Sequence, residues 1–412
     1  MDNKKKIFIW TLFDFANTSF SIVVVTFLYA VYFKKVVAQG EPVGDLFWSI
    51  GTSLAMIITA IISPVLGAIA DYSTGKKRFL LFFTLLCITA TASLFFVGEG
   101  QIFFGVALFV LANIGFEAGL VFYDAFLPEI TIPKNYGRVS GYGFAMGYLG
   151  SLATLAVIYP FIQADMIKES FPVSALFFLI FSLPLFFYIK DNRKKISEHE
   201  SFLLIGIKRV WNTLSHLKYH KNLAIFLLAY FFYIEGVNTI IFFSGNYAST
   251  TLGFTETELL IFFITVQTTA IAGSVLLGIL ADSIGQKKTI VITLIMWMIT
   301  VVIAFLITDK NGFYLVGLIA GAAMGSSQST SRSLMSKLTP PERKTEFFGF
   351  YSFFGKSSAV VGPLVFGLVS YLSGNQRYAI ISIGFFFLIG LLILLKVNDP
   401  KIIIDSANPS NR

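Results

Sequence analysis

Apolar stretches long enough to cross a lipid bilayer repeat along the whole chain of 412 residues. A helix of about 20 apolar residues spans the hydrocarbon core. Twelve predicted spans lie at 7–33, 47–70, 79–97, 102–123, 139–162, 173–189, 223–244, 258–281, 289–307, 312–334, 347–372 and 378–397. Charged residues make up 13% of the chain, against roughly 25% in a soluble domain. We therefore predict an all-α integral membrane protein with 12 transmembrane helices.

The lysine and arginine residues fall mainly on one side of these spans. Of the 31, 25 lie on the side of the amino terminus, five lie on the other side and Lys356 lies within a span. The positive-inside rule then places both termini in the cytoplasm. This distribution accounts for the net charge of +8 without a nucleic-acid partner. The short outer connections favour a bacterial plasma membrane.

One long connection divides the spans six and six. We predict an amino-terminal half over 1–189, a cytoplasmic linker over 190–221, a carboxyl-terminal half over 222–397 and a cytoplasmic tail over 398–412. Residues 201–218 mix apolar and basic side chains, as a helix on a membrane surface does. His216 and His220 have the spacing of a metal pair but no clear third ligand, so we predict no metal site.

Sequence patterns recur at equivalent stations of the two halves. GAIADYSTGKKR at 67–78 follows the second span, and GILADSIGQKK at 278–288 follows the eighth. Spans one and seven each carry an acid, two residues and then Asn-Thr, which places acid and amide on one helix face. Spans four and ten both end in proline-containing turns that lead into glycine-rich helices. The chain is therefore expected to consist of two related halves.

The two Gly-x-x-Ala-Asp loops resemble a signature of the major facilitator superfamily. The resemblance implies two pseudo-symmetric six-helix halves, with a site near the midplane and access that alternates by rocking. Gly67 and Gly278 remove side chains where helices approach closely. Asp71 and Asp282 are expected to dock against helix amino ends or cations across the gap between halves, as locks that break on opening. The superfamily usually has a basic residue after this aspartate, where this chain has tyrosine and serine, so the ion-pair pattern stays open.

Four further segments resemble a narrower family. They are FDFANTSF at 13–20, SGYGFAMGYLG at 140–150, QSTSRSLMSKLTP at 328–340 and EFFGFYSFFGKSSAVVGPLVFG at 346–367. They are similar to signatures of the autophagy-related vacuolar effluxer family and its bacterial relatives. The resemblance touches both halves and implies secondary transport, with amino-acid efflux attributed to the vacuolar members.

Ionisable and amide side chains inside apolar spans are costly and mark candidate functional positions. The predicted substrate- or proton-binding residues are Asp14, Asn17, Asn113, Glu117, Glu235, Asn238, Gln328 and Lys356. The predicted gating residues are Gly67, Asp71, Asp124, Arg138, Gly278, Asp282, Arg332, Gly362 and Pro363. By depth, Lys356 has Asp14 or Glu117 as its candidate partner. The resemblance implies that spans one, four, seven and ten line the cavity, and most of the predicted binding residues lie on them.

Two roles stay open for the buried acids. A desolvated carboxylate can take up and release a proton as access alternates. Alternatively, it binds the ammonium of a zwitterionic substrate while Lys356 or Arg332 binds the substrate carboxylate. The structural alternative is an acid that stays paired with a cation or caps a broken helix.

We expect a monomeric secondary transporter in the lipid bilayer, without a cofactor. Its expected substrate is a small polar metabolite, an amino acid or similar zwitterion, moved together with protons. The spans contain no HExxH, Gly-x-Ser-x-Gly or Walker sequence, which argues against an enzyme and against direct ATP drive. A lipid or lysolipid flippase on the same fold is the alternative, but the polar faces of spans one, four and seven favour a smaller hydrophilic substrate.

Overall fold

A computed structural model of the chain describes residues 3–191, 202–215, 220–359 and 361–398. These residues form helices and connecting turns and contain no strand. His199, His216 and the predicted tail beyond 398 lie outside the described residues. The predicted boundaries of the linker and tail stay predictions.

Six spanning segments form the amino-terminal half. The first is built from α1 (Asn3–Phe20), the π-helical η1 (Ser21–Thr26), α2 (Leu28–Tyr32) and the π-helical η2 (Phe33–Val37). The next three are α3 (Pro42–Ile69) with η3 (Ala70–Thr74), α4 (Lys76–Ser93) with η4 (Leu94–Phe96), and α5 (Ile102–Asp124) with α6 (Leu127–Ile130). After η5 (Pro133–Asn135), α7 (Tyr136–Gln163) and α8 (Ser170–Tyr188) complete the half.

A surface helix and six further spanning segments follow. The surface helix is α9 (Phe202–Ser215). The carboxyl-terminal half contains α10 (Lys221–Thr250), α11 (Glu256–Ile284), α12 (Gln286–Leu306), α13 (Lys310–Leu338), η7 (Pro341–Arg343), α14 (Lys344–Ser358), α15 (Val361–Ser373) and α16 (Gln376–Leu394).

In the described residues, 11 helical segments are long and apolar enough to cross a membrane. The predicted span missing from these 11 is the tenth, 312–334, which corresponds to α13; this helix has 29 residues but carries the small and hydroxyl-rich run GSSQSTSRS in its second half. Most of the spanning segments extend beyond the predicted boundaries; the first runs over Asn3–Val37 rather than 7–33. Hydropathy marks only the part of a helix within the hydrocarbon core, and the helices continue past it.

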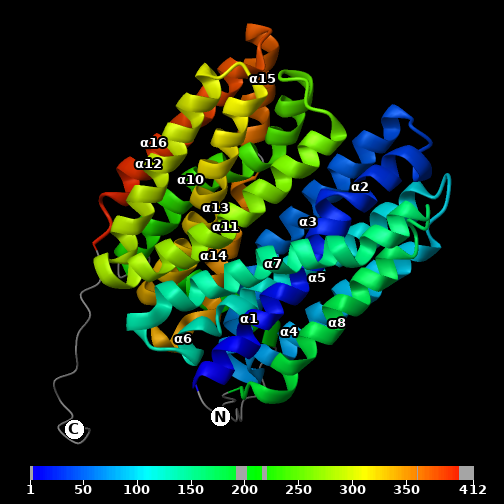
Figure 1. Cartoon of the computed structure of the whole chain (residues 1–412). Coiled ribbons are helices and arrows are strands. Elements are labelled where there is room, and N and C mark those ends of the chain that lie inside the picture. Colours follow the sequence, from blue (N-terminus) through cyan, green and yellow to red (C-terminus); the bar gives the residue numbers. More distant parts are fainter. Residues whose placement is uncertain (1–2, 192–201, 216–219, 360, 399–412) are drawn as a thin grey trace, which may run out of the picture.

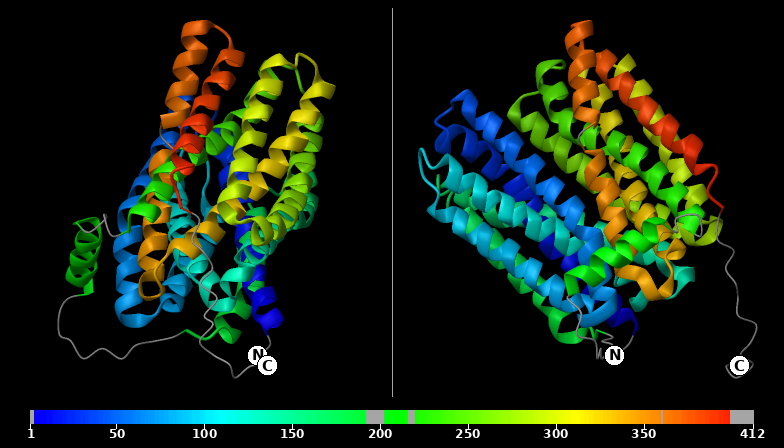
Figure 2. Two further views of the ribbon diagram at one scale, coloured as in Figure 1. Left: turned by 90° about the vertical axis from the view of Figure 1, so that its left-hand side faces the viewer. Right: turned by 180° about the vertical axis from the view of Figure 1, so that it is seen from behind.

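The two halves form two bundles that approach each other at one end (Figures 1 and 2). Helix α1 begins and α16 ends at this end, which we call the terminal side; the opposite end, where α2 and α15 lie, is the distal side. The halves meet mainly through α3 against α14 and α7 against α11 and α13. The bundles diverge toward the distal side (Figure 1).

The span predicted as one helix over 347–372 is two helices. α14 ends at Ser358 and α15 begins at Val361. Pro363 lacks an N–H, and its ring crowds the carbonyl of Ala359 four residues earlier, which breaks or kinks a helix. The predicted span is present as one segment, Pro341–Ser373, and its two helices meet shortly before the proline that the sequence singled out as a gating position.

Candidate functional site

Arg332 of α13 extends from the carboxyl-terminal half into the amino-terminal half. Its side chain is 2% exposed. Nη1 donates to Asp14 of α1 at 3.2 Å and to Asp124 of α5 at 3.0 Å. Nε donates to the hydroxyl of Ser140 on α7, and Nη2 donates to its carbonyl, both at 2.9 Å. One guanidinium, with its several donors in a rigid plane, thus joins three helices of one half to a helix of the other.

Aromatic rings enclose this guanidinium. Its Cζ lies 4.7 Å from the ring centre of Trp10, 5.7 Å from that of Tyr123 and 4.2 Å from that of Phe144. The Trp10 and Tyr123 rings stack 4.7 Å apart. The Trp10 indole donates to the Tyr123 carbonyl at 3.2 Å, and the Tyr123 hydroxyl donates to the Trp10 carbonyl at 3.1 Å. A desolvated cation–π contact contributes on the order of 2 kcal/mol, so these rings stabilise the cation where it lies.

Gly143 of α7 leaves the space that the Asp14 and Arg332 side chains fill. A Cβ at this position would lie 2.5 Å from the nearest atom of both groups and 3.0 Å from the Trp10 ring. Ser140, Gly143 and Phe144 lie in the segment 140–150 quoted above, but neither their contacts with Arg332 nor that of Trp10 was predicted. Glycine, serine and aromatic residues are common in this chain, and no spacing distinguishes these four from the rest.

A second ion pair joins the halves, between Lys356 of α14 and Glu117 of α5. Glu117 precedes Asp124 by seven residues on the same helix, about 10 Å toward the distal side at 1.5 Å per residue. The Lys356 side chain is 25% exposed in the middle of a spanning segment. Of the two predicted partners of Lys356, Glu117 is correct and Asp14 is wrong, because Arg332 holds the Asp14 carboxylate.

The two ion pairs have the same polarity. The amino-terminal half supplies the acids Asp14, Asp124 and Glu117, and the carboxyl-terminal half supplies Arg332 and Lys356. Removing one partner of a buried pair costs about 3–5 kcal/mol, because the other charge is left without compensation. The halves can therefore separate only if these charges find other partners.

The four amide residues predicted to bind substrate or protons do not all lie at the ion pairs. Gln328, one turn from Arg332 on α13, accepts a hydrogen bond from Tyr148 of α7 at 2.8 Å and so also joins the halves. Asn17 is buried one turn from Asp14. Asn113 is fully buried, and neither of its side-chain polar atoms has a hydrogen-bond partner among the described residues. Asn238 is half-buried on α10, and the structure does not bring it to the ion pairs.

Glu235 lies fully buried on α10 within the carboxyl-terminal half. Its carboxylate accepts the N–H of Gly362, in the first turn of α15, and the Thr239 hydroxyl at 3.2 Å. A Cβ on Gly362 would overlap both the Glu235 carboxylate and the Thr239 hydroxyl. No lysine or arginine pairs with Glu235 among the described residues. It therefore caps the second helix of the broken span, which is the structural arrangement foreseen for a buried acid.

Asp71 links the end of the second span to the start of α14. Its carboxylate accepts the backbone N–H groups of Thr345 at 3.1 Å and Glu346 at 2.8 Å. These N–H groups lie in the first turn of the helix and have no intrahelical partner. Gly67, one turn earlier, packs so closely that a Cβ would overlap the Thr345 carbonyl. We call this contact the α3–α14 closure.

Asp282 makes the equivalent contact in the other half. Its carboxylate accepts the backbone N–H groups of Gly137 at 2.7 Å and Arg138 at 3.1 Å, in the first turn of α7. The Arg138 side chain adds a bond from Nε at 2.7 Å. Gly278 packs against the Gly137 carbonyl, 2.7 Å from where its Cβ would lie. We call this contact the α7–α11 closure; it contains an ion pair, whereas Asp71 of the α3–α14 closure pairs with no lysine or arginine among the described residues.

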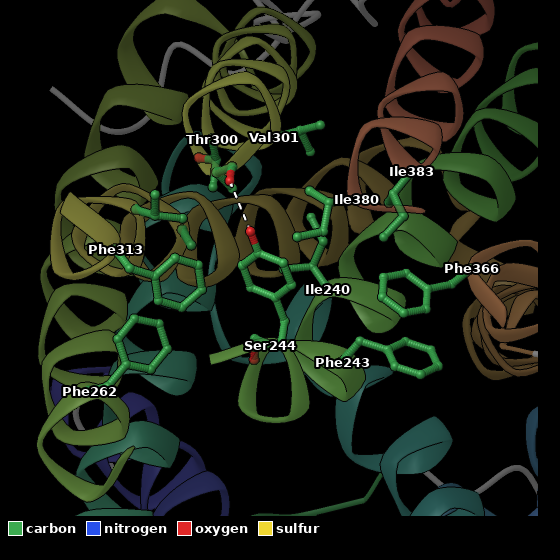
Figure 3. A pocket seen from close by; sticks show the side chains of 14 residues that line it. Ile240, Phe243, Ser244, Phe262, Thr300, Val301, Phe313, Phe366, Ile380 and Ile383 are labelled. Carbon is green, nitrogen blue, oxygen red and sulfur yellow. Dashed lines mark hydrogen bonds between the residues drawn. The ribbon is translucent and has the colours of Figure 1, made fainter. Parts of the chain in front are cut away.

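A cavity of about 50 Å³ lies elsewhere, inside the carboxyl-terminal half (Figure 3). Phe243, Phe262, Phe313 and Phe366 are among its lining side chains. The Tyr247 hydroxyl donates to the Ala304 carbonyl at 3.5 Å. None of the predicted site residues lines this cavity, and its apolar wall does not suit a charged ligand. The candidate site is therefore the set of ion pairs between the halves.

Comparison with known proteins places the chain in a family. The family model described as "Vacuole effluxer Atg22 like" matches residues 45–406. The chain is 33% identical over 405 residues to YxiO of Bacillus subtilis strain 168, described as an uncharacterized MFS-type transporter, covering 95% of this chain and 94% of YxiO. It is 22% identical over 377 residues to autophagy-related protein 22 of Kluyveromyces lactis, covering 82% and 77% of the two chains.

Solved structures share the fold. The human organic anion transporter MFSD10 (TETRAN) matches with a TM-score of 0.76 and 14% identity, over 96% of this chain and 100% of that one. FucP, a major facilitator superfamily transporter solved in the outward conformation, matches with a TM-score of 0.74 and 14% identity, over 97% and 99%. The 12-helix fold of this superfamily is thus confirmed. The chain belongs to the Atg22-like vacuole effluxer family and is a transporter of the major facilitator superfamily, not an enzyme.

Proposed function

We propose that this transporter moves a small zwitterionic metabolite of the amino-acid class, and that proton uptake and release at Glu235 accompanies the movement. The observation that carries the proposal is the polarity of the ion pairs at Arg332 and Lys356, with the acids in the amino-terminal half and the cations in the carboxyl-terminal half. The sequence analysis predicted functional roles for these charged residues. Their contacts between the halves support a role in substrate binding.

A zwitterion is the ligand that best replaces such a pair. Its ammonium can bind Glu117 or Asp14, and its carboxylate can bind Lys356 or Arg332. A ligand with one charge would leave one side chain of the pair uncompensated, at a cost of several kcal/mol. A zwitterion leaves neither, so it can enter between Glu117 and Lys356 while the halves change position. The Lys356 side chain is 25% exposed, so the protein does not fully enclose this pair.

Glu235 is the proposed proton site because no cation holds it in the ionised form. Its carboxylate bonds to the amino end of α15 through Gly362 and to Thr239. Protonation would remove the negative charge that favours this helix end. Uptake and release of a proton at Glu235 can thus loosen and restore the contact between α10 and the broken span.

The closures define the proposed state of the transporter. We place the terminal side in the cytoplasm of a bacterial plasma membrane, because most of the lysine and arginine residues lie on that side. Asp71, Asp282 and Arg332 lie near the ends of their helical segments on that side. The bundles diverge on the distal side (Figure 1). We therefore assign the structure to a state closed to the cytoplasm, in which Asp71 and Asp282 act as locks.

A thermal-shift screen of the purified protein tests this function. A ligand that binds only the folded state raises the apparent stability as its concentration rises. Amino acids, dipeptides, sugars, nucleosides and lysolipids form the library. We expect a shift with amino acids that disappears in the double variant Glu117→Gln/Lys356→Met, in which no charge is left unpaired.

The matched control is Asp45→Asn, which removes a pair with Lys34 that is exposed at both side chains. This variant should keep the wild-type shift. A shift confined to lysolipids would contradict the proposal and favour a flippase.

A further inference from the structure

Helix α9 lies outside both bundles near the terminal side and crosses the spanning helices rather than running along them (Figure 2, right). In the chain it stands between the two halves. It packs on α3, where Gly206 allows close contact: a Cβ there would lie 2.7 Å from Ile69 and 3.0 Å from Val65. Ile205 and Thr213 are buried in this contact.

The polar contacts of α9 reach both sides of the α3–α14 closure. The Thr213 hydroxyl donates to the Glu346 carboxylate and accepts a bond from Arg343 at 3.1 Å. Arg209 lies 3.7 Å from the Glu346 carboxylate and 5.6 Å from the centre of the Tyr72 ring. Glu346 also donates its backbone N–H to Asp71 of the closure. Helix α9 therefore bridges α3 and α14 where these helices must part if the terminal side is to open.

The opposite face of α9 is apolar and exposed. Leu204, Ile207, Trp211 and Leu214 are exposed large hydrophobic residues, and Trp211 reaches 72%. Their spacing of i, i+3, i+7 and i+10 places them on one side of a helix. The described residues do not cover this face. One face of α9 packs on the protein, and its other face is apolar and exposed. This exposed face is expected to contact a further apolar surface.

The surrounding charge identifies that surface. Residues 190–221 contain eight lysines and arginines against three acids. Tryptophan is favoured at the membrane–water interface, and basic residues attract the anionic lipids of the cytoplasmic leaflet. We propose that the exposed face of α9 binds the anionic surface of the cytoplasmic leaflet, and that α9 bound in this way holds the α3–α14 closure shut. The inference uses the cytoplasmic placement of the terminal side given under the proposed function, and it needs no substrate.

The first experiment locates α9 relative to lipid. The chain has one cysteine, the buried Cys87, so Cys87→Ser gives a background for single labels. A bimane label at Trp211→Cys is compared with one at Lys134→Cys, an exposed position on the terminal side. Vesicles contain phosphatidylcholine alone or with phosphatidylglycerol, and brominated acyl chains quench buried labels. We expect several-fold stronger quenching at 211 than at 134, greatest with phosphatidylglycerol. Equal quenching at both positions would overturn lipid binding.

The second experiment measures the closure. Ser63 of α3 and Ser274 of α11 are buried at equivalent positions, where their carbonyls face Gly349 and Gly141. Cysteines at these positions become reactive to maleimide only when the closures part. If α9 holds the closed state, Trp211→Ala or removal of phosphatidylglycerol should raise labelling at position 63 several-fold. An unchanged rate in both tests would overturn the holding role. Because no ligand is added, failure here is distinguishable from failure of the substrate proposal.

Discussion

Asp14 and Glu235 occupy the same station in the two halves, yet their surroundings differ. Each acid begins the same pattern, in which two residues separate the acid from Asn-Thr. Asp14 bonds to Arg332 of the opposite half. Glu235 bonds to Gly362 and Thr239 of its own half. A shared sequence pattern therefore produces a link between the halves in one case and a helix cap within one half in the other.

The difference follows from the residue at one equivalent station of the two halves, which is Asp124 in one half and Arg332 in the other. Asp124 stands 12 residues before Tyr136, the first residue of α7, and Arg332 stands 12 residues before Lys344, the first residue of α14. This station therefore holds an acid in one half and a cation in the other. Asp14 receives a cation across the interface, but no cation comes from the equivalent station toward Glu235. The asymmetry leaves Glu235 as the acid best suited to exchange a proton.

The largest expected effect is the removal of the cation. Arg332→Met leaves Asp14 and Asp124 without a counter-charge, and we expect a loss of about 3–5 kcal/mol in stability. Thermal or denaturant unfolding in detergent measures this loss. The double variant Arg332→Met/Asp14→Asn should regain part of it. Lys34→Met, at an exposed pair, should lose no more than about 1 kcal/mol. Equal losses in the two single variants would contradict a buried, structural pair at Arg332.

The next effect separates Glu235 from Asp14 in function. Glu235→Gln keeps an acceptor for the Gly362 N–H but cannot release a proton at neutral pH. In proteoliposomes we expect this variant to lose accumulation driven by a proton gradient while substrate exchange continues. Unchanged accumulation would remove Glu235 from the coupling mechanism. Loss of exchange as well, with a native unfolding temperature, would assign it to substrate binding instead.

Glycine substitutions sharpen the same comparison. Gly143→Ala crowds the Arg332 and Asp14 side chains, and Gly362→Ala crowds Glu235 and Thr239. Overpacking of this kind costs about 1–3 kcal/mol, measured as a loss of unfolding stability. Gly367→Ala on α15 is the control, because nothing lies within 4 Å of its Cβ position. A loss at position 367 as large as at the other two would contradict crowding as the cause, because alanine in place of glycine favours a helix.

The smallest effects concern the two closures. Asp71→Asn and Asp282→Asn should each raise maleimide labelling of cysteines at Ser63 and Ser274, because each weakens bonds to a helix amino end. Arg138→Ala should change labelling less than Asp282→Asn, because the Arg138 side chain is 41% exposed and exposed pairs contribute up to about 1 kcal/mol. Labelling rates unaffected by both aspartate variants would assign these residues to folding alone.

The sequence predicted the fold and several contacts because apolar length and repeated patterns reflect local physics. Runs such as 47–70 need only composition to be recognised, and the repeated loops placed Asp71 and Asp282 at equivalent positions. Depth along a helix narrowed the partners of Lys356 to two, one of which was wrong. The depth of a residue in the membrane does not show how its helix is rotated toward the other half. It therefore did not distinguish Asp14 from Glu117 as the partner of Lys356.

Other features were not predictable for a physical reason. The Trp10 and Phe144 rings act through their packing around Arg332, and nothing in their own spacing marks this. Helix α13 is the least apolar span because its second half carries polar residues. These residues are tolerated there because they pack against other helices. The interruption before Pro363 could not be predicted from the proline alone, since proline inside other spans, such as Pro64 of α3, leaves the helix continuous.

The proposal that the substrate replaces both partners of an inter-half ion pair can be tested directly. The test compares one amino acid with two derivatives that each carry one charge. The methyl ester of the amino acid found in the screen keeps the ammonium charge and loses the carboxylate charge, and its N-acetyl form keeps the carboxylate charge and loses the ammonium charge. We expect the zwitterion to raise the unfolding temperature of the wild-type protein. Neither derivative should do so at the same concentration. An equal shift with either derivative would contradict the claim that the substrate replaces both partners of an inter-half ion pair.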